Sequence, residues 1–290
     1  MPSQLALGTV QFGLDYGVAN RDGRPALDEV ARILEAAAES GIDTLDTAIA
    51  YGESEARLGA IGVAGWKIVT KLPAAPADCT DLAGWVVAEV EASLRRLRVD
   101  RVHAVLLHRP EQLLGTSGPE LIVGLQRLKN DGLAAKTGVS IYAPDELDAL
   151  FAMSEPDLVQ SPLSLFDHRL LRSGWLERLG ARGVEVHTRS AFLQGLLLLD
   201  ASARPAYFNR WQPLWQAWDD WLRATRLSPL QACVRYALSV GGSDRVVVGV
   251  DSVAQLRQIV AASEECAIPP PTWPDIDDAD LLNPAHWKLS

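Results

Sequence analysis

Two patterns of apolar and polar residues alternate along nearly the whole chain. Short runs of apolar, β-branched residues predict buried strands, and apolar positions spaced three and four residues apart predict helices. The segment Leu82–Leu97 shows the helical spacing, and Leu27–Ser40 ends just before Gly41, a residue that commonly terminates helices. Strands are predicted at Leu5–Thr9, Thr44–Ala48, Lys67–Leu72, Val102–His108, Ala135–Ser140, Leu158–Leu163, Val184–Ser190 and Arg245–Val250.

This alternation predicts an α/β fold of a particular class. Eight strands that alternate with helices over 290 residues match the (β/α)8 barrel, or TIM barrel, in number and length. The competing doubly wound sheet would show a GxGxxG motif after its first strand, where this chain has LGTVQFGLDYG. We find no internal repeat and no low-complexity linker, so residues 1–290 are predicted to form a single domain. Residues 266–290, rich in proline and acidic residues, are predicted to be a surface tail that can also border the barrel mouth.

Residues 199–227 do not fit the simple alternation of strands and helices. They contain four of the nine tryptophans, Trp211, Trp215, Trp218 and Trp221, at helical spacing. This spacing predicts a helix that packs its aromatic stripe on the barrel. A second interpretation concerns the preceding loop, Asp200–Gln212, which could cover an active site as a lid.

Charge and cysteine content exclude several classes of function. With 27 basic and 37 acidic residues the net charge is −10, which repels phosphate backbones, so no nucleic-acid partner is expected. Cys79, Cys233 and Cys266 are odd in number, far apart and without CxxC spacing, which fits a reducing, cytoplasmic location. The chain shows no signal-peptide pattern and no uncharged run of about 18 residues, so no membrane association is expected. Metal-ligand spacing is missing around three histidines, for which solvated or structural roles and no metal are predicted: His103, His168 and His187.

Candidate chemistry appears where the predicted strands end, which is where TIM barrels place their active sites. Asp46 ends the second strand with Tyr51 just beyond it, Lys71 lies near the end of the third strand, and His108 ends the fourth. A tyrosine pKa near 10 is too high for proton transfer at neutral pH, but a nearby lysine would lower it. A carboxylate would hold the lysine charged, and the histidine could align a carbonyl oxygen. These four residues could protonate a C=O group, but they require a hydride donor, hence a cofactor.

Each of these residues also has a structural interpretation when it is taken alone. Asp46 could cap its strand, Lys71 could be a charge at the rim, and His108 could be a core histidine. Their occurrence together at the ends of three consecutive strands favours the catalytic interpretation. Glu53 and Glu55 are instead predicted to lie in the first turn of the next helix, where acids suit the positive end of the helix dipole.

Several motifs resemble those of the aldo-keto reductase superfamily, in order and spacing, from about Leu5 to Ala262. They are DTAIAYGESEARLG (residues 46–59), IVTKL, LLHRPE, LVQSPLSLFDHRLL and RSAFLQGLLL. The resemblance implies a (β/α)8 barrel with a nicotinamide dinucleotide, usually NADP, extended across the mouth. It also implies that Tyr51 is the general acid/base, that Lys71 and Asp46 tune it, and that His108 orients the carbonyl group.

The same resemblance implies cofactor contacts. Ser140 and Gln160 would bond the nicotinamide carboxamide, and the buried amide of Gln160 requires a partner in any case. Arg189 takes a place that is often aromatic, where its planar guanidinium could stack on the nicotinamide ring. Further contacts with the dinucleotide are implied at the end of the first strand and after the seventh: Thr9, Ser190, Leu193 and Gln194.

The segment around the eighth strand leaves the choice of cofactor open. Gly249, Asp251 and Gln255 occupy places where NADP-using relatives commonly have lysine or arginine. Asp251 would repel a 2′-phosphate, yet it could accept hydrogen bonds from ribose hydroxyls. The helix that begins after Ser252 offers its N-terminus to a phosphate. NADP therefore follows from the family and NAD from these residues.

The predicted function is an NAD(P)-dependent oxidoreductase that reduces an aldehyde or ketone. A mixed polar and aromatic rim is predicted from two loops and suits a sugar-like carbonyl substrate: Phe12, Asp15, Tyr16, Tyr207, Phe208, Asn209 and Trp211. The alternatives are an NAD-dependent sugar (aldose) dehydrogenase and a non-catalytic, dinucleotide-binding accessory protein. The sequence leaves the oligomeric state open.

Overall fold

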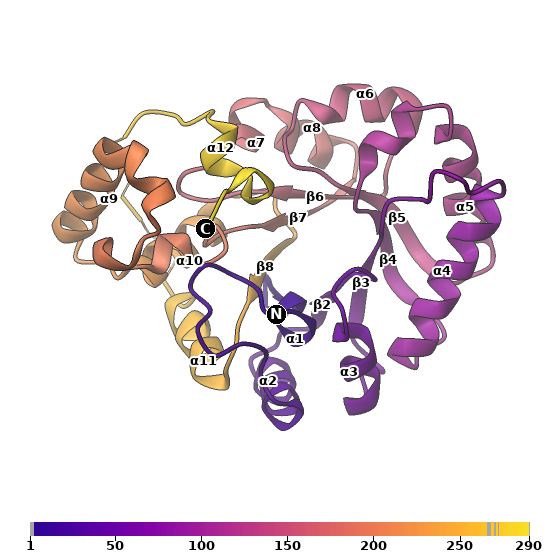
Figure 1. The fold of residues 1–290 in the computed structure, drawn as a ribbon, viewed down its shortest axis with the longest axis horizontal. Helices are drawn as coiled ribbons and strands as arrows, with labels where there is room; N and C mark the ends of the chain where they lie inside the picture. Colours follow the sequence, from indigo (N-terminus) through magenta and orange to yellow (C-terminus); the bar gives the residue numbers. More distant parts are fainter. Residues whose placement is uncertain (1–2, 266–267, 270, 272, 290) are drawn as a thin grey trace.

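Eight parallel strands close into a barrel, which confirms the predicted fold class (Figure 1). The structure is a computed structural model that describes residues 3–265, 268–269, 271 and 273–289. Each strand pairs with the next along the chain, and the last pairs with the first. The strands are β1 (Leu5–Gly8), β2 (Thr44–Asp46), β3 (Lys67–Leu72), β4 (Val102–Leu107), β5 (Ala134–Ser140), β6 (Leu158–Pro162), β7 (Glu185–Arg189) and β8 (Arg245–Gly249), within two residues of the predicted bounds.

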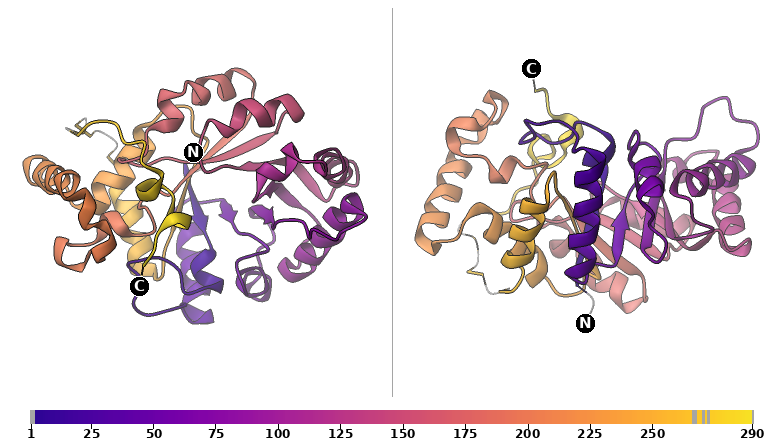
Figure 2. Two further views of the ribbon diagram at one scale, coloured as in Figure 1. Left: turned by 45° about the horizontal axis from the view of Figure 1, so that its top comes forward. Right: turned by 90° about the horizontal axis from the view of Figure 1, so that it is seen from below.

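Helices cover the outside of the barrel, and the main hydrophobic core lies between the helices and the strands (Figures 1 and 2). The helices are α1 (Val10–Gly13), α2 (Leu27–Glu39), α3 (Ser54–Ile61), α4 (Leu82–Leu97), α5 (Gly118–Asn130), α6 (Glu146–Met153), α7 (Arg169–Arg172), α8 (Trp175–Ala181), α9 (Gln212–Thr225), α10 (Pro229–Ser239), α11 (Val253–Ala262) and α12 (Ala279–Leu282), with short 3-10 helices at Pro110–Leu114, Leu196–Leu198, Ala201–Ala203, Ala206–Trp211 and Pro284–His286.

Alternate residues of each strand point to the helices or into the barrel. A small apolar cluster of Val69, Ala104, Leu106 and Leu158 is separate from the main core and belongs to the inward-facing set. A Cβ on Gly138 of β5 would lie 1.8 Å from the carbonyl oxygen of Leu158, so only glycine permits this approach of β5 to β6. The inward positions nearest the carboxyl ends of the strands are polar instead, and they form the candidate site.

A second, aromatic core surrounds α9 at one side of the barrel (Figure 1). The predicted tryptophan helix is confirmed, and Trp215, Trp218 and Trp221 are buried. The stripe packs on the barrel, as predicted, through a cluster that includes Phe166 and Trp273. This cluster joins the segment after β6, the segment after β7 and the C-terminal tail, so α9 supports the loops of the mouth from outside.

The sequence predicted no membrane-spanning segment, no metal site and no disulfide, and the described residues bear on each of these predictions. None of the helices that the structure describes could span a bilayer. Within the same residues no three potential metal ligands gather in one place. Cys79 and Cys233 are free thiols, whereas Cys266 lies outside the described residues.

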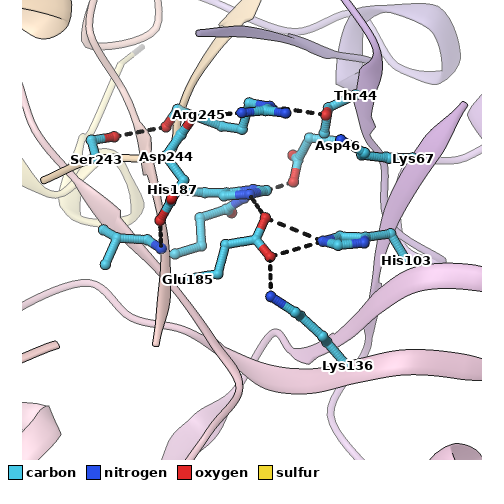
Figure 3. Close-up of polar contacts among 12 residues, drawn as sticks. Thr44, Asp46, Lys67, His103, Lys136, Glu185, His187, Ser243, Asp244 and Arg245 are labelled. Carbon is cyan, nitrogen blue, oxygen red and sulfur yellow. Dashed lines mark hydrogen bonds and ion pairs between the residues drawn. The ribbon is translucent and has the colours of Figure 1, made fainter. Parts of the chain in front are cut away.

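Glu185 at the start of β7 collects three donors at the amino end of the barrel interior (Figure 3). Its carboxylate lies 2.9 Å from His103 Nε2, 2.7 Å from His187 Nε2 and 2.6 Å from Lys136 Nζ. These contacts give His103 and His187 the structural roles that were predicted for them. Burial alone would raise the pKa of Glu185, but the hydrogen bonds from these three residues outweigh it and hold the pKa well below its usual range.

Replacing Glu185 by glutamine should destabilise the barrel in a pH-dependent manner. A carboxyl group whose pKa is depressed by folding stabilises the protein above its ordinary pKa of 4.5, and this contribution is lost as the pH falls further. We expect Glu185→Gln to lower the free energy of unfolding near pH 7 by about 3 kcal/mol, with a smaller difference at acidic pH. Urea denaturation between about pH 7 and pH 3 measures this. The exposed Glu120→Gln is the control, and a difference that stays constant with pH would contradict the assignment.

Candidate active site

Asp46 and Lys71 form a buried ion pair at the carboxyl ends of β2 and β3. Lys71 Nζ donates to Asp46 Oδ2 at 2.7 Å and to the Thr47 carbonyl oxygen at 2.9 Å. The lysine is 1% exposed and the aspartate 4%. Burial lowers the pKa of Lys71, and the Asp46 carboxylate opposes this effect. The predicted link between these two residues is therefore present as a direct contact.

Tyr51 lies in the loop between β2 and α3, beside this pair. Its backbone is fixed at both sides, by a bond from Tyr51 N to the Ala48 carbonyl and from Ser54 N to the Tyr51 carbonyl, each 3.0 Å. A Cβ on Gly13 would lie 1.8 Å from the Tyr51 carbonyl oxygen, so glycine is required there for the loop to approach α1. Lys71 Nζ lies 5.1 Å from the centroid of the Tyr51 ring. The tyrosine and the lysine are neighbours without a direct hydrogen bond between them in the described structure.

The expected effect on the tyrosine pKa is reversed in this structure. Burial raises the pKa of Tyr51 above its ordinary value, and the Asp46 carboxylate adds to the rise. Arg189 opposes the shift without cancelling it. Lys71 was predicted to lie close enough to favour the phenolate, but its ammonium group is directed at Asp46 instead. Tyr51 therefore keeps its proton at neutral pH.

His108 follows β4 and completes the group of four. Its ring lies 5.9 Å from the Tyr51 ring, centroid to centroid, at an interplanar angle of 77°. Burial, together with the charges of Lys71 and Arg189, lowers the pKa of His108 to about 4. The imidazole is therefore neutral near pH 7 and carries one N–H that can donate a hydrogen bond.

A cavity of about 1110 Å³ lies at the carboxyl ends of the strands, and its wall includes Asp46, Tyr51 and His108. This exceeds the ~300–1,000 Å³ that is typical of small-molecule sites. Of the predicted cofactor residues, five line the cavity between β1 and the segment after β7: Thr9, Gln160, Arg189, Ser190 and Gln194. Three more line it at β8 and α11: Gly249, Asp251 and Gln255.

Three other predicted cofactor residues do not form part of the cavity wall. Ser140 is buried behind Gln160 and donates from Oγ to Gln160 Oε1 at 3.2 Å. Leu193 is fully buried in the aromatic core around α9. Ser252 is the N-cap of α11, and its Oγ accepts a bond from Gln255 N at 3.3 Å. Ser140 and Ser252 therefore bond to residues that line the cavity, and Leu193 packs in the core next to it.

Gln160 has its hydrogen-bond partners inside the protein. Its Nε2 donates to Asp46 Oδ1 at 2.6 Å, and its Oε1 accepts from Ser140. The argument that a buried amide must indicate a ligand is therefore wrong here, because Asp46 and Ser140 already satisfy it. Gln160 still reaches the cavity wall, so it connects the ion pair to any bound molecule.

Arg189 is held by the protein at the mouth. Its guanidinium donates to the Ile141 carbonyl oxygen at 2.9 Å and to Ser190 Oγ at 3.0 Å. It also lies over the ring of Tyr142, 5.0 Å from the centroid. The predicted stacking partner was a nicotinamide ring; the structure adds Tyr142 as a partner within the chain. This fixes a positive charge beside the four residues of the site.

The rim differs from the prediction at several places. No described residue of the segment 200–212 lines the cavity, so the lid interpretation is not supported, and Tyr207, Phe208 and Trp211 belong to the aromatic core instead. Phe12 is buried in the main core. The prediction that the tail borders the mouth is confirmed by Pro284 and Ala285.

Sequence reasoning missed other residues of the cavity wall because no motif marks them: Gln11, Asn20 and Gln258. Tyr16, which was predicted for the rim, does line the wall. Burial raises the pKa of Tyr16 to about 12. The wall therefore carries neutral tyrosines, amides and small residues, with few charges.

Glu53 and Glu55 have different roles from each other. Glu55 is in the first turn of α3, as predicted, but it is buried and accepts bonds from Thr70, Ser93 and Arg96 at 2.6–2.8 Å. It ties α3 to β3 and α4 rather than serving the helix dipole alone. Glu53 is an exposed N-cap residue paired with Arg24 at 3.0 Å.

The fold and this site define a TIM barrel with a cavity at the carboxyl ends of its strands, lined by side chains suited to proton transfer. The chain belongs to the aldo/keto reductase family, whose profile matches residues 4–281. This confirms the resemblance that the motifs indicated.

Individual relatives share between about a quarter and a third of their aligned residues with this chain. The chain is 34% identical over 161 residues to a rat protein called aflatoxin B1 aldehyde reductase member 2, a match that covers 52% of this chain and only 43% of the rat protein. It is 26% identical to the uncharacterized oxidoreductase YqkF of Bacillus subtilis, over 90% of this chain and 87% of that protein. The solved structure of PA4992, a putative aldo-keto reductase from Pseudomonas aeruginosa, superposes with a TM-score of 0.66 at 28% identity, covering 90% of each chain.

The depressed pKa of His108 can be measured directly. We expect its imidazole signals in NMR to titrate near pH 4, because burial and the nearby charges disfavour the cation. Arg189→Gln should raise this midpoint, since it removes one of those charges. Arg127→Gln, on the exposed surface of α5, is the control for a lost charge at a distance. A midpoint close to the ordinary 6.5 in the wild-type protein would contradict the described burial.

Proposed function

We propose that this protein reduces an aldehyde or ketone, whose carbonyl group would receive a hydride from a bound nicotinamide dinucleotide and a proton from Tyr51. The observation that supports this most is the convergence of Tyr51 and His108 on one cavity wall, with the Asp46–Lys71 pair buried beside them. Both wall residues are neutral donors near pH 7, as a carbonyl oxygen that gains electrons requires.

The cavity fits a dinucleotide in its chemistry as well as its volume. Gln11 Oε1 is buried at the wall without a hydrogen-bond partner among the described residues, so it is free to accept one from a ligand. At one end Gln160, Arg189 and Gln194 would hold the cofactor, and at the other end Asp251 and Gln255 would do so. When bound, the reduced nicotinamide supplies the hydride. The family resemblance supports NADP in this role, whereas Asp251 supports NAD.

The proton follows a short path through this chain's own residues. The Tyr51 hydroxyl donates its proton to the carbonyl oxygen as the carbonyl carbon gains the hydride, which leaves an alcohol and a phenolate. The neutral His108 donates a hydrogen bond to the same oxygen and fixes its position. Because the pKa of Tyr51 is raised, the phenolate then takes up a proton from water, while Lys71, held by Asp46, contributes only its charge 5.1 Å from the ring centroid.

The substrate is proposed to be a small, polar carbonyl compound. Tyr16, Tyr142 and Arg189 at the mouth offer hydroxyl groups and a cation beside the reacting position. Two alternatives share the same site: oxidation of a sugar with NAD, and binding of a dinucleotide without turnover. Steady-state rates in both directions with both dinucleotides separate the three functions.

Replacing Tyr51 by phenylalanine should abolish turnover without preventing cofactor binding. The ring remains, but the proton donor is lost, so we expect kcat to fall by about 10²–10⁴-fold. Carbonyl reduction is followed by oxidation of NADH and NADPH, and the Kd of each dinucleotide is measured by calorimetry. Tyr207→Phe is the matched control, because the Tyr207 hydroxyl bonds to the Asp280 carbonyl away from the cavity. If Tyr51→Phe kept its turnover, Tyr51 would not be the proton donor.

A further inference from the structure

The charged side chains of the cavity wall differ between its two ends. Among the described residues of its wall, Arg189 is the sole lysine or arginine, and it lies at the end with Tyr51 and His108. At the other end the wall includes Asp251 after β8, together with Gln258 and Ile259 of α11. In a closed barrel of eight strands β4 and β8 are on opposite sides, so these ends face each other across the mouth. A dinucleotide whose nicotinamide lies near His108 therefore directs its adenosine toward Asp251 and α11.

A carboxylate already covers the N-terminus of α11, the feature that the sequence analysis offered to a phosphate. Helices α2 and α11 lie side by side (Figures 1 and 2), and Glu29 Oε1 accepts the bond from Val253 N at 2.8 Å. Arg32 holds the other oxygen of Glu29 at 2.7 Å. The Val253 amide is thus already bonded to the Glu29 carboxylate. The predicted phosphate site at the N-terminus of α11 is therefore occupied by a side chain of the protein.

The neighbouring amides are satisfied by side chains as well. Asp251 N donates to Gln255 Oε1 at 2.7 Å, and Gln255 N donates to Ser252 Oγ at 3.3 Å. Without these N–H groups a phosphate at this end would have to rely on side-chain cations. The described part of the cavity wall offers none there.

Asp251 is placed to accept hydrogen bonds from a ligand. It is half-buried at the wall, and Asn20 Nδ2 contacts its Oδ1 at 3.4 Å. Among the described residues Gln255 also contributes a side-chain hydrogen bond to this carboxylate, and both partners are neutral amides. Two vicinal ribose hydroxyls are the neutral donors that such a carboxylate binds, whereas a phosphate on the ribose would place like charges together.

We propose that the α11 end of the cavity selects NAD(H) over NADP(H), with Asp251 as the acceptor for the ribose hydroxyls and Glu29 as the carboxylate that occupies an N-terminal amide of α11 and so denies it to a 2′-phosphate. This inference rests on the proposed function, because it assumes that the cavity binds a dinucleotide. It departs from the NADP that the family resemblance implies. Its basis is the Asp251 carboxylate at the wall, the amides of Asp251 and Val253 that side chains already occupy, and the lack of a lysine or arginine in the described wall at this end.

Binding of fragments isolates this end of the cavity from the chemistry. The Kd values of ADP-ribose and of 2′-phospho-ADP-ribose are measured by calorimetry on the full-length protein, alongside NADH and NADPH. We expect the unphosphorylated member of each pair to bind about tenfold more tightly or better, with a ratio that narrows as salt screens the repulsion. Equal or tighter binding of the phosphorylated members would overturn the selectivity. If neither NADH nor NADPH binds, the proposed function itself fails.

Charge-neutral variants identify the residues responsible. In Glu29→Gln combined with Asp251→Asn, both side chains keep an acceptor oxygen but lose their charge. We expect 2′-phospho-ADP-ribose to gain about tenfold in affinity relative to ADP-ribose. Glu35→Gln, an exposed acid on the same helix as Glu29, is the matched control and should leave the ratio unchanged. Thermal unfolding confirms that each variant folds, and a ratio that stays at the wild-type value in the double variant would refute the role of the two carboxylates.

Discussion

The buried ion pair between Lys71 and Asp46 is the interaction on which the rest of the site depends. Removing two charges from water costs several kcal/mol per ion, so the pair is stable only if the remaining bonds of both groups are satisfied. The barrel provides them: Gln160 donates to the second oxygen of Asp46, and the Thr47 carbonyl accepts from Lys71. Gln160 is 114 residues away along the chain. The site therefore exists only when β2, β3 and β6 have closed into one barrel.

The same dry surroundings determine the protonation of the neighbours. Burial raises the pKa of Tyr51 and lowers that of His108, so both are neutral at the cavity wall. The charges are held elsewhere, in the ion pair and on Arg189, where hydrogen bonds fix them. A wall of neutral donors next to fixed charges is suited to a reaction in which negative charge develops on one oxygen and is then neutralised by a proton.

The sequence predicted the barrel and the four central residues because both depend on local patterns. Strand ends are readable from hydrophobic runs, and a barrel brings all strand ends to one mouth whatever the details of packing. The errors concern contacts between distant side chains. Glu29 meets Val253, Arg189 meets Tyr142, and Gln160 meets Asp46 only after folding. Lys71 was likewise predicted to lower the pKa of Tyr51. Its ammonium group is bonded to Asp46 at 2.7 Å and lies 5.1 Å from the centroid of the Tyr51 ring.

The described cavity wall has Arg189 as its sole lysine or arginine, so the proposed dinucleotide would be held largely by neutral groups. The segment after β7, part of which lines this wall, has an unusual backbone conformation. Ser190, Leu193 and Gln194 all have positive φ, a conformation that costs side-chain-bearing residues about 1–3 kcal/mol each. Gln194 also accepts a bond from Val18 N at 3.0 Å, which joins this segment to the loop after β1 across the cavity. Such strain persists only where the surrounding structure enforces it, and here it shapes a wall whose backbone amides and hydroxyls can serve where cations are scarce.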